Sequence, residues 1–246
     1  MDSALLTIAA GLRAQTESLD LLGNNVANSA TTGYKADTAF YQLFMTPEAA
    51  SATGNGEALW MPVVEGSLID YQQGPLTQTD SPFDVALLGP GFLKVQGPAG
   101  VLYTRNGHMN RSAAGQLVTQ EGLSVLDAQD RAIELPGQGK LAIGSDGALS
   151  IEGVTLAQLG LVEFDGRPPL MKAGSNYFQA VSDKEPRPAA ETVVQQGSLE
   201  GSNVNAPESA VRLMLASRNF EMLRRIATMI GDEMNGRAVD ELGRTS

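Results

Sequence analysis

Residues 24–35 read N-N-V-A-N-S-A-T-T-G-Y-K, and this stretch ends a long helical pattern with residues that do not favour a helix. Asparagine competes with its own backbone for hydrogen bonds, so the three asparagines within five residues disfavour a continuing helix. The stretch could be a helix terminus, a catalytic or ligand-binding asparagine cluster, or an assembly contact. In its context we predict a helix exit, after which Asn28 to Gly33 turn the chain outward and Tyr34 packs against the next element.

The segment before this stretch predicts an amphipathic helix over residues 2–28. Its apolar residues recur at alternating spacings of three and four, which is a heptad pattern with one polar interruption at Gln15. Asp2 or Ser3 can cap its start, and the asparagines followed by Gly33 supply its end. The apolar seam consists of Leu5, Ile8, Leu12, Leu19, Leu22 and Val26.

A second heptad pattern predicts a long helix near the other end of the chain. Asn205 is a natural N-cap for it, Pro207 and Glu208 suit its first turn, and Gly236 is expected to mark its end. Its seam consists of Leu213, Ala216, Phe220, Leu223, Ala227, Ile230 and Met234. A second apolar stripe consists of Val211, Leu215, Met222, Ile226 and Met229. The two stripes are wider than a two-stranded seam, so we expect this helix also to contact other subunits or the middle of the chain.

The middle of the chain predicts an all-β module. Over residues 61–196, short runs of strand-forming residues alternate with Gly, Pro, Asp and Asn turns. Residues 92–105 predict one hairpin, and residues 141–151 predict another around Ser-Asp-Gly. Residues 46–60 indicate a loop or linker, and residues 183–191 indicate a second linker or an extended edge passage.

We therefore predict an α+β fold of several layers, in which the terminal helices pair as a coiled-coil layer around a central all-β domain. The expected boundaries are residues 1–35 for the N-terminal helix, 36–80 for an extended or linker region, 81–196 for the β domain and 197–246 for the C-terminal helix. The simpler alternative is a helical hairpin packed on one face of a β domain.

Composition excludes several functions. The net charge of −11 and a pI near 4.5 argue against binding to nucleic acid or to an anionic membrane surface. The absence of cysteine excludes disulfides and thiolate metal sites. No stretch approaches the roughly 20 apolar residues of a membrane span, and the amphipathic start does not resemble a secretory signal peptide.

No motif indicates catalysis. His108 is the only histidine and there is no cysteine, so a zinc site or a Ser-His or Cys-His pair has little to build on, and we expect His108 to be a turn or strand residue. The Gly-rich stretches at residues 87–92 and 136–140 lack the spacing of a phosphate loop. We predict no enzymatic activity, no cofactor and no metal.

Three ordered motifs carry a family resemblance. Residues 27–35, A-N-S-A-T-T-G-Y-K, resemble the N-terminal signature of the bacterial flagellar rod and hook proteins. Residues 84–96, D-V-A-L-L-G-P-G-F-L-K-V-Q, are similar to the β-domain signature of that family, and residues 196–208, Q-G-S-L-E-G-S-N-V-N-A-P-E, to its C-terminal motif. Within the family, the opening M-D-S and L-G-L-V-E-F at residues 159–164 resemble the proximal (FlgF) type more than the distal (FlgG) type.

The resemblance implies a structural subunit of the flagellar basal-body rod. In that design the terminal helices form an inner coiled-coil layer, and the β module lies outside it. It further implies export through the flagellar type III apparatus without a cleaved signal peptide, polymerisation across the periplasm with copies of itself and other rod proteins, and transmission of torque. The alternative is a periplasmic binding module on a β scaffold, which would need an aromatic-rich groove that an aromatic content of 5% does not favour.

We predict that the assembly contacts come from the two helices and the motifs beside them. On the N-terminal side they are Leu5, Ile8, Leu12, Leu19, Leu22, Asn25, Val26, Asn28, Gly33 and Tyr34. On the C-terminal side they are Asn203, Asn205, Leu213, Phe220, Leu223, Ile226 and Ile230.

Overall fold

The computed structural model describes residues 2–45, 60–137, 139–164, 168, 170–174, 176–181 and 186–244. The chain forms two compact units, each built from segments that are distant in sequence. The first, here called the helical unit, comprises Met1–Ala27, Asp37–Asp70 and Asn205–Ser246. The second, here called the β unit, comprises Asn28–Ala36 and Tyr71–Val204. The α+β class is as predicted.

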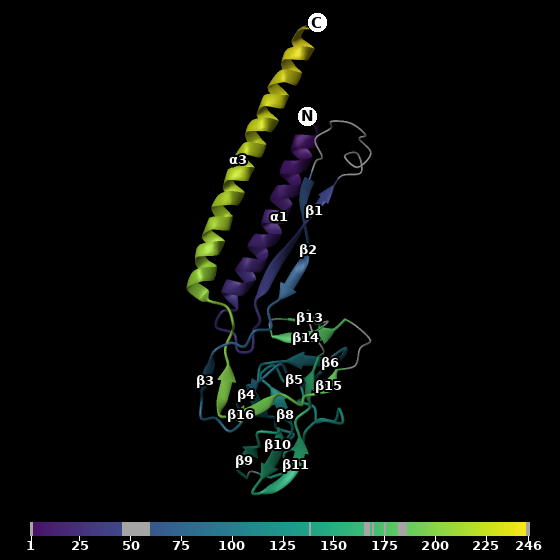
Figure 1. Ribbon diagram of the computed structural model, residues 1–246, viewed down its shortest axis with the longest axis vertical. Helices are drawn as coiled ribbons and strands as arrows, with labels where there is room; N and C mark the ends of the chain where they lie inside the picture. The colour runs from purple at the N-terminus through teal and green to yellow at the C-terminus, as the bar shows by residue number, and fades with distance from the viewer. Residues whose placement is uncertain are drawn as a thin grey trace. The chain divides into compact units, whose positions relative to one another are not determined.

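Two helices dominate the helical unit. Helix α1 (Asp2–Ala27) and helix α3 (Ala206–Arg244) contact each other and run antiparallel, side by side (Figure 1). The small side chains of Ala14 and Ala216 are buried, and this lets the helices approach closely. Gln15, the polar residue in the predicted seam, donates a hydrogen bond from Nε2 to the carbonyl oxygen of Ala216 at 3.0 Å.

The start of α3 confirms the predicted cap, but its end does not. Asn205 Oδ1 accepts a hydrogen bond from the backbone N–H of Glu208 at 3.2 Å, and the Asn205 carbonyl accepts one from the N–H of Ser209. The helix continues through Gly236 to Arg244, so the prediction that Gly236 ends it is wrong. A glycine inside a helix costs only about 1 kcal/mol relative to alanine, which a helix of 39 residues tolerates.

A two-stranded antiparallel ribbon completes the helical unit. Strands β1 (Asp37–Met45) and β2 (Trp60–Ile69) pair from Asp37 with Ile69 to Met45 with Trp60, with one irregularity after Phe40. Both strands contact α1. The expected linker region 36–80 therefore contains a long ribbon, while most of the loop expected at 46–60 lies outside the described residues.

The β unit confirms the predicted all-β module. Its largest sheet is antiparallel with strand order β13-β14-β6-β5-β12-β15, and both predicted hairpins are present, as β5/β6 and β9/β10. The short strand β15 forms one edge of that sheet, which fits the extended passage predicted there. The strands are β3 (Leu76–Gln78), β4 (Val85–Leu88), β5 (Phe92–Gly97), β6 (Gly100–Thr104), β7 (Met109–Arg111), β8 (Leu117–Thr119), β9 (Leu141–Ile143), β10 (Ala148–Ile151), β11 (Val154–Gln158), β12 (Leu161–Glu163), β13 (Leu170–Lys172), β14 (Tyr177–Ala180), β15 (Arg187–Pro188), β16 (Val193–Gln196) and β17 (Ser198–Glu200).

The two faces of the large sheet bury different residues, because side chains alternate along each strand. Leu93 and Val95 of β5 belong to an aliphatic core that also includes Leu149 of β10. Phe92 belongs instead to an aromatic cluster, in which it makes edge contacts with Tyr71 and other rings. The remaining rings of that cluster are Tyr103, Phe164 and Phe178.

Candidate assembly faces and the anchor of the N-terminal motif

The predicted seams of α1 and α3 are half-buried within this single chain. On α1 this holds for Ile8, Leu12, Leu19, Leu22 and Val26, and on α3 for Leu213, Phe220, Leu223 and Ile230. The side chain of Leu5 lies outside the described residues. Each seam therefore shields part of the other, as expected for two packed amphipathic helices.

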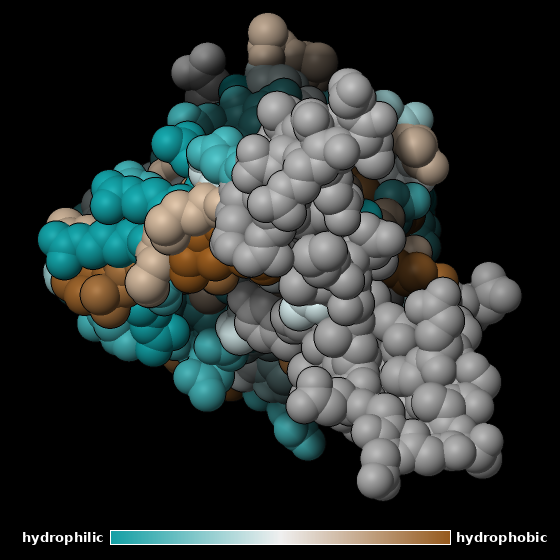
Figure 2. Space-filling view, turned by 90° about the horizontal axis from the view of Figure 1, so that it is seen from above, coloured by the Kyte–Doolittle hydropathy of each residue, from teal (hydrophilic) through white to brown (hydrophobic). Residues whose placement is uncertain are grey.

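A row of apolar residues on α3 remains exposed. The exposed fractions reach 57% at Val211 and 62% at Met229. Each helical residue turns the chain by about 100°, so this row lies to one side of the seam. Its other members are Leu215, Met222 and Ile226, and Met214 beside them is also exposed. We call the five residues Val211, Leu215, Met222, Ile226 and Met229 the α3 stripe. Figure 2 shows apolar (brown) residues exposed among hydrophilic (teal) ones at the end of the molecule seen from above.

The predicted site residue Asn25 holds the backbone within the helical unit. Its Nδ2 donates to the carbonyl oxygen of Asp37 at 2.7 Å, and its Oδ1 accepts from the N–H of Asp37 at 2.9 Å. The side chain is buried and reproduces the two-bond pattern of a β-bridge. Asn25 thus fastens the start of β1 to the last turns of α1.

Residues 28–36, here called the N-strap, belong to the β unit. The N–H of Thr31 donates to the carbonyl of Asn28 at 3.1 Å, and the N–H of Tyr34 donates to the carbonyl of Thr31 at 3.3 Å. These bonds make the predicted turn. Tyr34 is 2% exposed, and the Lys172 ammonium lies 3.9 Å from the centre of its ring while donating to the carbonyl of Lys35.

Gly33 brings the N-strap against the backbone of the β unit. Its φ of 71° lies in the left-handed region, and a Cβ at this position would lie 2.4 Å from the backbone nitrogen of Asn106. Its N–H donates to the carbonyl oxygen of Glu200 at 2.8 Å. Only glycine combines this conformation with so close an approach, so the Thr-Thr-Gly of the opening stretch is a docking element as well as a turn.

Beside Gly33 lies a buried charged cluster of Lys35, Arg105 and Glu200, here called the anchor cluster. Glu200 Oε1 accepts from Lys35 Nζ at 2.6 Å and from the N–H of Gly74 at 2.9 Å, while Oε2 accepts from Arg105 Nε at 2.8 Å. The three side chains are between 0% and 2% exposed. The other guanidinium nitrogens of Arg105 donate to the carbonyl oxygens of residues 87, 89 and 91. Every charge is therefore paired and hydrogen-bonded, as burial requires.

Asn203 completes this region. Its Oδ1 accepts from the N–H of Ala36 at 2.7 Å, its Nδ2 donates to the carbonyl of Gln72 at 3.2 Å, and its own N–H donates to the carbonyl of Tyr34. Lys35 Nζ donates to the same Gln72 carbonyl at 2.5 Å. The predicted residues Gly33, Tyr34 and Asn203 thus lie together, whereas Asn25 and Asn205 serve the helical unit.

The sequence analysis missed the anchor cluster. Lys35 stands in the motif at residues 27–35 and Glu200 in the motif at residues 196–208, while Arg105 ends the hairpin predicted at residues 92–105, but none of the three was predicted as a site residue. An available signal was the presence of charges of opposite sign, Lys35 and Glu200, within two motifs made mostly of small and uncharged residues. Since buried charges need partners, such charges predict a mutual contact.

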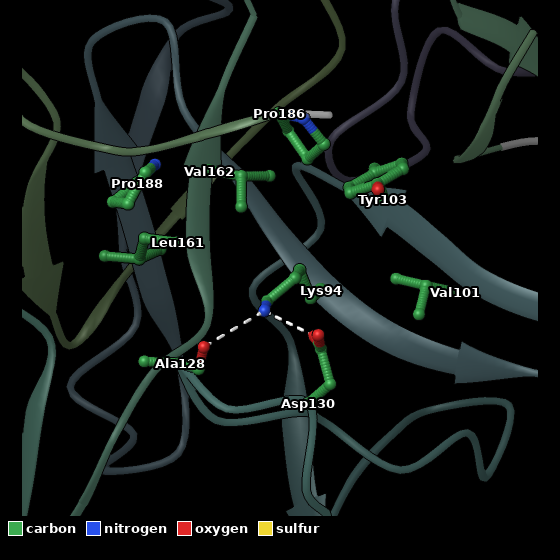
Figure 3. Close-up of a pocket in the computed structure, with 9 residues that line it drawn as sticks. All are labelled: Lys94, Val101, Tyr103, Ala128, Asp130, Leu161, Val162, Pro186 and Pro188. Carbon is green, nitrogen blue, oxygen red and sulfur yellow. Dashed lines mark hydrogen bonds and ion pairs between the residues drawn. The ribbon is translucent and has the colours of Figure 1, made fainter. Parts of the chain in front are cut away.

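A cavity of about 360 Å³ in the β unit offers no catalytic arrangement (Figure 3). Lys94 Nζ pairs with the carboxylate of Asp130 at the cavity wall, so each charge neutralises the other. Burial, and secondly the negative charge of Asp130, raise the pKa of Tyr103 and keep its hydroxyl neutral. The other lining residues are Val101, Ala128, Leu161, Val162, Pro186 and Pro188.

His108 is a structural residue. Its Nδ1 lies 2.7 Å from Oδ1 of the buried Asp84, and the backbones of the two residues form a bridge. Within the described part of the chain, no three His, Asp or Glu residues are grouped so that they could hold a metal ion. The described helices include none that is long and apolar enough to cross a membrane.

Comparison with known proteins assigns the family. The family model described as "Flagellar hook protein FlgE/F/G D1 domain" matches residues 86–151, which include Arg105. The one described as "Flagellar basal body rod FlgEFG protein C-terminal" matches residues 195–240, which include Glu200 and Asn203. The flagellar basal-body rod protein FlgF of Caulobacter vibrioides is 31% identical over 245 residues, covering 99% of each chain. The chain belongs to the flagellar basal-body rod protein family.

Rod proteins of both types resemble this chain. The FlgF protein of Rhizobium meliloti is 32% identical over 90% of each chain, and the FlgG protein of Agrobacterium fabrum is 33% identical over 94% of this chain and 96% of its own. The predicted membership is confirmed. These relatives are named as rod components and not as enzymes, which supports the prediction of a non-enzymatic protein.

Proposed function

We propose that this chain is a structural subunit of the flagellar basal-body rod that polymerises through its terminal helices. The observation that carries the proposal is the α3 stripe. The seams of α1 and α3 shield each other, yet large apolar residues on another side of α3, at Val211 and Leu215 and again at Met222, Ile226 and Met229, stay in contact with water. Exposed apolar residues of this kind favour a protein–protein contact, and the chain belongs to a family whose members are named as components of the flagellar rod.

The geometry of the stripe favours an open assembly. It lies beside the intrachain seam, so a partner helix can pack there without displacing α1. A contact between one face of a subunit and a different face of the next is heterologous, and repeated contacts of this kind build helical arrays. The partners we propose are copies of this chain and other rod proteins, and the coiled-coil pairing predicted from the heptads belongs to that assembled state.

The location and mechanical role follow from the same proposal. A rod subunit would occupy the periplasmic part of the basal body and transmit torque through closely packed helices. Its export through the flagellar apparatus, without a cleaved signal peptide, stays a prediction of the family resemblance. Assignment to the proximal, FlgF type rests on the sequence motifs and on the FlgF relative that covers nearly the whole chain.

Charge placed in the α3 stripe tests the proposal. In a strain that lacks the native gene, Met222→Glu combined with Ile226→Glu is expected to abolish swimming in soft agar while the purified variant keeps its circular dichroism spectrum. The matched control is Ser217→Glu, which adds a charge at an exposed position of α3 away from the stripe. Full motility of the double variant would contradict the proposal.

A further inference from the structure

The β unit holds two chain segments at one place. One is the N-strap, which follows α1, and the other is the segment 198–204, here called the C-strap, which precedes α3. Their backbones meet directly through the bond from the Gly33 N–H to the Glu200 carbonyl at 2.8 Å. Asn203 adds the bonds to Tyr34 and Ala36. Each strap therefore satisfies polar groups of the other.

Glu200 is the centre of this contact because it carries the single negative charge of the anchor cluster. It faces two cations, Lys35 from the N-strap and Arg105 from the end of β6, and water reaches none of the three. Without Glu200 in place, docking the N-strap would bury the Lys35 ammonium next to a guanidinium of the same sign. A buried charge without a partner is strongly unfavourable.

We propose that the anchor cluster is a latch that makes docking of the N-strap conditional on the C-strap. The C-strap is also held by the pairing of β17 with β3, whereas the N-strap needs Glu200 of the C-strap to pair Lys35. In a rod subunit, which is the function proposed above, the segment that follows α1 would be anchored only when the segment that precedes α3 is in place. In a chain whose C-strap is not yet bound to the β unit, the N-strap would stay undocked.

Hydrogen exchange on the purified full-length chain tests the latch. In Glu200→Gln, amide exchange in the N-strap, including Gly33 and Tyr34, is expected to accelerate on the order of 100-fold. Exchange in the core strand β5 stays unchanged. Glu134→Gln is the matched control, since it removes an exposed carboxylate of the same unit. Unchanged exchange in the N-strap of Glu200→Gln would overturn the proposal.

A reciprocal measurement covers the case in which Glu200→Gln does not fold. Lys35→Met leaves the Arg105–Glu200 pair intact and so keeps every remaining charge paired. Because coupling between two sites is reciprocal, this change in the N-strap is expected to accelerate exchange in the C-strap, at Leu199 and Glu200. Acceleration confined to the N-strap would refute the latch. Both measurements use the isolated chain, so their failure is distinct from a loss of motility.

Discussion

The helical unit and the β unit differ in which residues they bury and which they leave exposed to water. The β unit buries the anchor cluster and pairs each of its charges, whereas the helical unit leaves a row of large apolar residues on α3 in water. The anchor cluster is satisfied within one chain, whereas the exposed apolar row has no cover within the described residues. This difference is what the proposed function expects of a subunit whose β unit is completed by folding and whose helical unit is completed by assembly.

The largest expected effect comes from removing a buried charge. Arg105→Met removes the Arg105 donors of the Gly89, Gly91 and Leu87 carbonyls, of which Leu87 keeps a bond from Gln73, and it removes one partner of Glu200. It should therefore lower the free energy of unfolding by roughly 3–5 kcal/mol. Arg131→Met is the matched change at an arginine that is 73% exposed, and it should cost less than about 1 kcal/mol. Urea unfolding of both variants measures the two changes in the free energy of unfolding. Equal changes would contradict the claim that the buried Arg105 contributes more to stability than the exposed Arg131.

The next largest effects are expected at two glycines, one in each unit, where substitution by alanine should change stability in opposite directions. Gly33→Ala places a Cβ against the backbone of Asn106 at a positive φ and should lower the free energy of unfolding of the β unit by roughly 1–3 kcal/mol. Gly23→Ala in α1 meets no atom within 4 Å and should instead stabilise the helix by about 0.5–1 kcal/mol. Thermal unfolding followed by circular dichroism measures both changes. A stabilised Gly33→Ala would show that the N-strap is not docked as described.

Substitutions in the α3 stripe should hardly change stability. Met222→Glu and Ile226→Glu replace exposed side chains, so each should alter the free energy of unfolding by no more than about 0.5 kcal/mol. Urea unfolding of the isolated chain measures this. A large loss in either variant would mean that the stripe is packed within the chain, which would remove the contrast between the two units.

The smallest expected effect is a pH dependence at Asp127. Burial alone would raise the pKa of Asp127, but hydrogen bonds from Arg131 and from the N–H of Gln129, with the charge of Arg131, bring that pKa below its ordinary value of 3.8. A carboxyl with a lowered pKa stabilises the fold above its unfolded pKa, and the effect is lost as the pH falls through the folded pKa. Asp127→Asn should therefore be less stable than the native chain at neutral pH, and the gap should narrow below pH 3.8. A gap that is constant with pH would contradict this.

The periodic parts of the fold could be predicted from the sequence, because heptads and strand–turn alternation are local. Both helices, the Asn205 cap and both hairpins follow from such patterns. The anchor cluster could not be predicted in the same way, because Lys35, Arg105 and Glu200 meet only after strands distant in sequence have paired. The continuation of α3 through Gly236 was missed because helix length depends on packing, which outweighs the weak penalty of one glycine.

The roles of the asparagines also needed the structure. Asn25, Asn203 and Asn205 were all predicted as assembly contacts, and the sequence does not distinguish their local bonds from bonds to another subunit. In this chain Asn25 binds the backbone of Asp37, Asn203 binds the N-strap and Asn205 caps α3. Each side chain therefore has a task within the chain, whatever it contributes after assembly.

The central claim is that the α3 stripe is covered by another rod subunit in the assembled flagellum. Photo-crosslinking in living cells tests it most directly, with a photoreactive amino acid placed at Met222 and, as a control, at Ser217. We predict covalent products between this chain and a rod subunit from position 222 and none from position 217. Absence of such products from position 222 in motile cells would contradict the claim.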